Sequence, residues 1–192
     1  MGTIARGDLK RDNRLVRLMQ RFLRADDGVT VVEFAVVGPL FFAIIGATIE
    51  TALAFFAGYA LDAAVIDTSR LIRTGQPNYI SNTSADNYRA AMCGQLYGIF
   101  DCEELRISVQ GIGSFRDFTT TFPLEDDTGA WNFTQNYRGS GSSGSIDGGS
   151  YVMIEAYYKW PTFFNIPGLN AGQTADGKRL LAAAHVLRTE PF

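Results

Sequence analysis

An almost entirely apolar run, residues 29–49, is the feature that most limits what this chain can fold into. As an α-helix it would extend about 31 Å, which matches the hydrocarbon thickness of a bilayer. Residues 1–27 carry a net charge of +3, whereas the rest of the chain carries −6. Because a basic segment beside a span stays on the cytoplasmic side, we expect a single-pass membrane protein with a cytoplasmic N-terminus and a C-terminal head on the opposite side.

The composition limits the chemistry that the chain can perform. Hydrophobic residues make up 46% of the 192 residues, which excludes disorder as the main state. One histidine and two cysteines exclude a zinc finger and a His-rich metal site. His185 is interpreted as structural, and no nucleophile and base can be paired. We therefore predict no catalytic residue, no metal, no cofactor and no nucleic-acid partner.

The helical pattern continues beyond the apolar run. An apolar stripe extends through Leu61, Val65 and Ile72, and Gly75 with Pro77 then ends it. We expect one helix from Val29 to about Arg73, bent near Pro39 because proline removes a backbone hydrogen bond. Three regions follow: a basic cytoplasmic leader (1–28), a transmembrane and extended helix (29–75) and a periplasmic α+β head (76–192).

Within the head, the period of the apolar residues changes from helical to alternating. Ser84 is suited to cap a helix over residues 85–96. Alternation around Ile107 predicts a strand, and residues 115–122 read as its antiparallel partner across Gly111 and Gly113. Residues 138–149 are loop-like in composition. Strands are also predicted at 151–160 and at 180–188, where helix is the alternative. The fold class is therefore α+β, with a small antiparallel sheet packed on the long helix.

Glu33 is an acid within the apolar run. An isolated carboxylate there costs a few kcal/mol, so it is either functional or close enough to the interface to stay hydrated. Cutting the chain after Gly28 would create an α-amine at Val29, about 6 Å along the helix from Glu33. The amine of one subunit could then neutralise Glu33 of another.

These residues carry a family resemblance. Gly28 followed by Glu33-Phe34 matches the processing pattern of type IV prepilins. The stretch from DDGVTVVEFAVVGPLFF to DTSRLIRTGQ resembles the TadE-like minor pseudopilins of the tight-adherence (Flp) pilus system. The segments YRAAMCGQLYGIFDCEELRISV, YYKWP and HVLRTEPF resemble later parts of that family. The mature chain would begin with Val29, where many prepilins have phenylalanine.

The resemblance implies a structural or priming subunit of a thin adhesive pilus, one that is the substrate of an enzyme and not an enzyme itself. A prepilin peptidase would cut after Gly28, and Val29, Glu33 and Phe34 would serve processing and assembly. Its partners would be other pilins and pseudopilins, an inner-membrane assembly platform and the lipid bilayer. The alternative is an uncleaved single-span protein whose periplasmic domain scaffolds the secretion machine or binds a ligand.

The head contains two cysteines, and an acid lies at its junction with the apolar run. Cys93 and Cys102 are nine positions apart, and an oxidising periplasm favours a disulfide over two buried thiols. Glu50 directly follows the apolar run, and we interpret it as an interfacial acid in preference to a second assembly contact.

Overall fold

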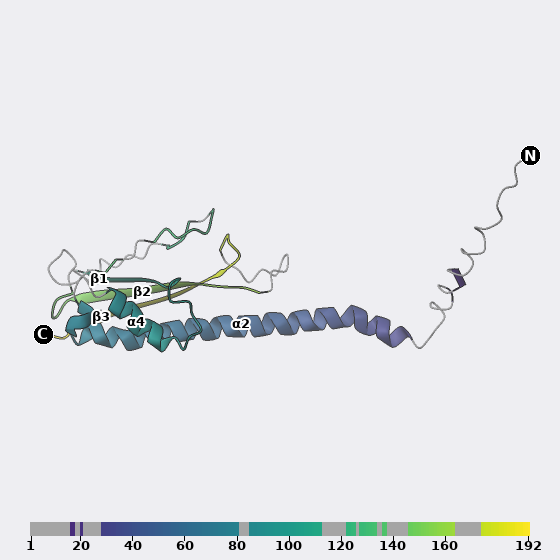
Figure 1. Cartoon of the computed structure of the whole chain (residues 1–192), viewed down its shortest axis with the longest axis horizontal. Helices are drawn as coiled ribbons and strands as arrows, with labels where there is room; N and C mark the ends of the chain where they lie inside the picture. Colours follow the sequence, from purple (N-terminus) through teal and green to yellow (C-terminus); the bar gives the residue numbers. More distant parts are fainter. Residues whose placement is uncertain are drawn as a thin grey trace, which may run out of the picture. The chain divides into compact units, whose positions relative to one another are not determined.

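The computed structural model describes residues 16, 17, 20, 28–80, 85–112, 122–125, 127–133, 136–137, 146–163 and 174–192. The chain divides into two compact units, Met1–Ala47 and Thr48–Phe192. The named elements are α2 (Val29–Arg73), α3 (Pro77–Ile80), α4 (Ala85–Gln95), β1 (Arg106–Ile112), β2 (Tyr151–Trp160) and β3 (Arg179–Arg188) (Figure 1). The predicted α+β class is confirmed, with a long apolar helix followed by a three-stranded antiparallel sheet.

Helix α2 has the bounds that the apolar stripe predicted, Val29–Arg73. It ends in a Schellman arrangement, in which the amide of Gly75 bonds the carbonyl of Ile72 and that of Gln76 bonds Leu71. Gly75 has φ +65°, a left-handed conformation that glycine adopts without a Cβ penalty. Pro39 lies inside the helix, and the bend expected near it stays a prediction.

The sheet has the strand order β1-β2-β3, and both pairings are antiparallel. Val109 of β1 faces Ile154 of β2, which faces His185 of β3. The strands predicted at 151–160 and 180–188 are confirmed, the latter against its helical alternative. The strand predicted at 115–122 lies outside the described residues except for Phe122, which is in no strand. The Ser84 cap, most of the leader and most of the 138–149 loop also lie outside them.

The core of the second unit lies between the sheet and the two helices, α2 and α4. Figure 1 shows the strands alongside the later part of α2, with α4 beside them. Small residues on α2 let the sheet approach closely, and larger side chains from all three strands fill the space. The fully buried members include Ala57, Leu61 and Val65 of α2, Tyr88 and Met92 of α4, Val109 of β1, and Val152 and Ile154 of β2. The α4 hydroxyl of Tyr88 lies 3.1 Å from that of Thr68, which satisfies both buried groups.

The opposite face of the central strand is also covered. Met153, Glu155, Tyr157 and Lys159 alternate with the core residues of β2, and all four are buried. The Phe133 ring packs edge-on against Tyr157, with centroids 5.0 Å apart. Part of the segment between β1 and β2 therefore forms an outer layer on the sheet.

Candidate functional site

The predicted processing site lies where α2 begins. Gly28 is in a single 3₁₀ position and Val29 is the first residue of α2. A Cβ placed on Gly28 would meet no heavy atom within 4 Å, and Val29 is 51% exposed. In the part of the chain that the structure describes, the backbone between these two residues is therefore sterically open.

Glu33 and Phe34 lie on the surface of the same helix. All residues at positions 29–37 are exposed, Glu33 among them, and the carboxylate forms no salt bridge with any described residue. The Phe34 ring extends along the helix over Gly38, whose added Cβ would lie 3.4 Å from it. Water is a poor solvent for such a surface, so lipid or another apolar helix is needed to cover it.

Glu50 has a role that sequence reasoning missed. Its side chain is only 5% exposed, and Oε1 accepts a hydrogen bond of 2.9 Å from the backbone amide of Phe163. The acid therefore ties Phe163, three residues after β2, to α2 at the residue that directly follows the apolar run. The two partners are 113 positions apart in sequence, so no local pattern could have revealed the contact.

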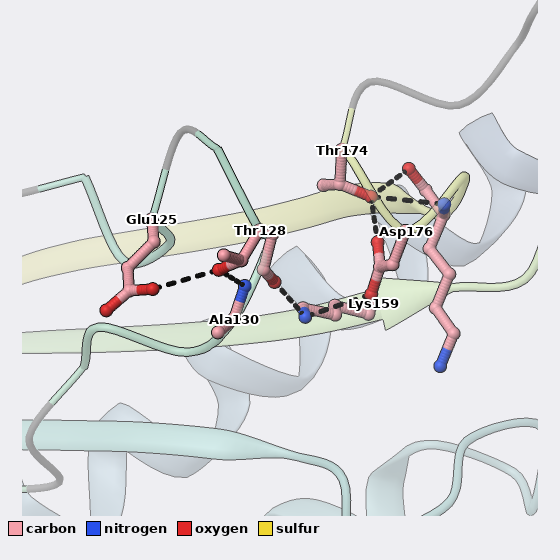
Figure 2. Close-up of polar contacts among 8 residues, drawn as sticks. Glu125, Thr128, Ala130, Lys159, Thr174 and Asp176 are labelled. Atoms are coloured by element: carbon pink, nitrogen blue, oxygen red, sulfur yellow. Dashed lines mark hydrogen bonds and ion pairs between the residues drawn. The ribbon is translucent and has the colours of Figure 1, made fainter.

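A polar cluster holds the outer layer of the sheet near the end of β2. The Lys159 ammonium donates to the carbonyl of Gly129 and forms an ion pair with Asp176 at 3.1 Å. Figure 2 shows Lys159 between these two loops, with Thr174 bonded to Asp176. The ammonium also lies 4.9 Å from the centre of the Trp131 ring. Lysine is seldom buried without partners, and here each contact compensates its desolvation.

Two carboxyl groups in the head have shifted acidities of opposite sign. Burial raises the pKa of Glu155, and the hydrogen bond from the Tyr157 hydroxyl at 3.0 Å lowers it only in part. Burial also acts to raise the pKa of Asp176, but the bonds from Thr174 and Lys159 outweigh it and hold that pKa below its usual value. Both groups belong to the packing of the outer layer.

Cys93 and Cys102 form a disulfide with Cα atoms 6.0 Å apart. It joins α4 to the turn that precedes β1. A closed loop of this size would stabilise the fold by up to about 3 kcal/mol in the chain-entropy model. The bond thereby fixes how the chain passes from helix to sheet.

A shallow groove of about 430 Å³ lies between α2 and the start of β3. Phe55, Tyr59 and Asp62 line it from the helix, and Arg179 from the strand. Its lining offers no pair of a nucleophile and a base. Among the described residues, no group of three or more His, Cys, Asp or Glu side chains is placed to hold a metal ion.

The comparison that bears on this arrangement concerns the long helix. The family model of the TadE-like protein matches residues 28–70, from the glycine before α2 almost to the end of that helix. Over this segment the chain is TadE-like. No curated protein and no solved structure shows a match.

The TadE-like segment contains Gly28, Val29, Glu33 and Phe34, and it also contains Glu50. The TadE-like family is associated with pili of the tight-adherence system, and its part there is structural rather than catalytic. Helix α2 is long and apolar enough to cross a membrane, with a mean hydropathy of 2.2 in its most apolar window. The segment is thus a candidate membrane anchor.

Proposed function

We propose that this chain is a minor pseudopilin, cut after Gly28 by a prepilin peptidase and then used as a structural or priming subunit of a tight-adherence pilus. The observation that carries the proposal is the TadE-like match, which begins at Gly28 and contains an exposed glutamate on an apolar helix. The basic leader favours a cytoplasmic N-terminus in the inner membrane, with the head in the periplasm. The peptidase, other pilins and pseudopilins, and an inner-membrane platform are the proposed partners.

The proposed mechanism is neutralisation of charge between subunits. Cleavage liberates the α-amine of Val29, and Glu33 of an adjoining subunit accepts it as a partner. Pairing offsets a cost of up to about 3 kcal/mol, the value for an isolated charge at the centre of a membrane-spanning helix. Phe34 then packs in the apolar contact between helices. An unpaired Glu33 is more stable near the hydrated interface than within the hydrocarbon. A paired Glu33 has no such penalty, so formation of the pair favours transfer of the subunit from lipid into the assembly.

The test is Glu33→Ala in cells that make the pilus, because it removes the charge and leaves the cut site intact. We expect normal cleavage but at least about a tenfold loss of the subunit from sheared pili, since 1.4 kcal/mol corresponds to a factor of ten. Quantitative immunoblotting of membranes and of pili measures both.

Asp67→Ala is the matched control, because it removes one exposed carboxylate from the same helix outside the apolar run. It should be cleaved and incorporated like the unchanged chain. Equal incorporation of the Glu33→Ala subunit would refute the pairing mechanism. An uncleaved chain that nevertheless supports piliation would favour a static scaffold.

A further inference from the structure

The head exposes aromatic side chains at the end that follows the apolar run. Phe55 and Phe56 of α2 are 66% and 55% exposed, and Phe163, just after β2, is 75% exposed. All three belong to the second compact unit. Phenylalanine at such exposure is unfavourable in water, so a partner that offers an apolar environment is expected to cover these rings.

Glu50 sets the level at which Phe163 lies. It directly follows residues 29–49, and its carboxylate bonds the amide of Phe163 at 2.9 Å. A residue at the edge of the hydrocarbon has little water to solvate its charge, and here the protein backbone supplies the donor. The bond also brings Phe163, which follows β2, to the same level as the first residues of α2 beyond the apolar run.

The distance along α2 agrees with an interfacial position. Phe55 lies six residues beyond Ile49, about 9 Å at 1.5 Å per residue. Long side chains on a helix extend back toward its N-terminus, here toward the membrane. The interfacial layer of a bilayer is roughly 5 to 8 Å thick on each side of the hydrocarbon, so the ring of Phe55 reaches it.

A cation lies at the same level. The guanidinium carbon of Arg179, the first residue of β3, is 5.2 Å from the centre of the Phe55 ring. A guanidinium that lies against an aromatic ring still has N–H groups that can bond lipid phosphates, so this pair suits a membrane surface. The site thus combines apolar rings with a cation, the chemistry that a phospholipid interface accepts.

We propose that Phe55, Phe56 and Phe163 form an interfacial anchor, by which the head rests on the phospholipid leaflet from which α2 emerges, before the subunit enters a pilus. The inference depends on the membrane location in the proposed function. It adds that the head itself binds lipid through Phe163 as well as through the two phenylalanines of α2.

The test places a tryptophan at position 163 in the full chain, reconstituted in phosphatidylethanolamine and phosphatidylglycerol vesicles. Phe163→Trp is compared with the unchanged chain, whose own emission comes from Trp131 and Trp160. Lipids brominated near the start of the acyl chain quench a tryptophan in the interface. We expect the added emission to be quenched at least about twofold more than the native emission.

Phe192→Trp is the matched control, because Phe192 is also an exposed phenylalanine, 55% exposed, at the other end of the second unit. It lies against Gly75, beyond the end of α2. Its added emission should not be quenched beyond the native emission. Equal, weak quenching of both variants would overturn the anchor.

Resistance of the chain to alkaline extraction tests the membrane location separately from the interfacial anchor. A chain that resists extraction but shows no quenching at position 163 keeps its span and loses the anchor. A chain that alkali extracts contradicts the membrane location and the anchor together. Quenching that persists at position 163 when Glu50→Ala is added would also contradict the anchor as described, because the bond to Glu50 sets the level of the ring.

Discussion

At the scale of single residues, the head contains two carboxyl groups whose environments act in opposite directions. Glu155 lies on the covered outer face of β2 with one hydroxyl donor, and burial dominates its pKa. Asp176 is at the surface of the polar cluster, and its hydrogen-bond donors together outweigh the effect of burial on its pKa. The first carboxylate therefore opposes folding when ionised, whereas the second favours it.

The opposite pKa shifts of Glu155 and Asp176 predict opposite effects of pH on the stability of the fold. The pKa of Glu155 is higher in the folded than in the unfolded state. Its contribution to the free energy of unfolding therefore falls as the pH rises through the range between these two pKa values. The folded pKa of Asp176 is lowered, so its contribution is present above the unfolded pKa and is lost as pH falls. Glu155→Gln should therefore raise the melting temperature at about pH 7, and Asp176→Asn should lower it.

Thermal unfolding of the full chain in detergent, followed by near-UV circular dichroism, measures both variants. Each difference from the unchanged chain should shrink as the pH is lowered to about 3.5, below the usual pKa of either carboxyl group. Differences of the same sign for the two variants would contradict the assigned environments.

At the scale of elements, the end of α2 depends on one glycine. Gly75 has φ +65° and closes the Schellman arrangement, and a Cβ there would collide with the Phe192 ring. Gly75→Ala should therefore destabilise the head by about 1 to 2 kcal/mol, the cost of a left-handed residue with a Cβ. Chemical denaturation of the second unit, followed by circular dichroism in detergent, gives this free energy.

Gly94 provides the matched control for that substitution. It lies within α4, where an added Cβ would meet nothing within 4 Å. Gly94→Ala should be neutral or stabilise by up to about 1 kcal/mol, because alanine favours the helix and restricts the unfolded chain. A Gly75→Ala protein as stable as the Gly94→Ala protein would show that the helix end does not need the left-handed conformation.

Elements with local signals were predictable from the sequence, and long-range relations were not. The bounds of α2 follow from its stripe and from Gly75, and the sequence predicts a strand at 180–188 with a helix as the alternative. The pairing of β1 with β2 has no local signal, because a long segment separates the two strands and strands adjacent in sequence usually pair.

The candidate site shows the same division. Gly28, Val29, Glu33 and Phe34 could be singled out because they are close together in sequence and their spacing carries the pattern. No sequence pattern predicts the burial of Lys159 or its ion pair with Asp176. Alternation along a strand does not reveal which loop will cover the outer face of the sheet. The same holds for the contact of Glu50 with Phe163.

At the scale of the whole molecule, the two compact units place different demands on their surroundings. The second has its own core between helices and sheet. The first has a described surface that is apolar and exposed, with only 6% of its most apolar window buried. An exposed apolar helix of this kind needs lipid or other apolar helices around it, and the proposed pilus subunit would meet first the one and then the other.

The central claim is that the chain is cut between Gly28 and Val29, and N-terminal mass mapping of the protein from native membranes tests it most directly. Samples are compared from cells with and without an active prepilin peptidase. We expect a mature chain that begins at Val29 when the peptidase is present and a chain with its leader when it is absent. A leader retained in both samples would contradict cleavage between Gly28 and Val29.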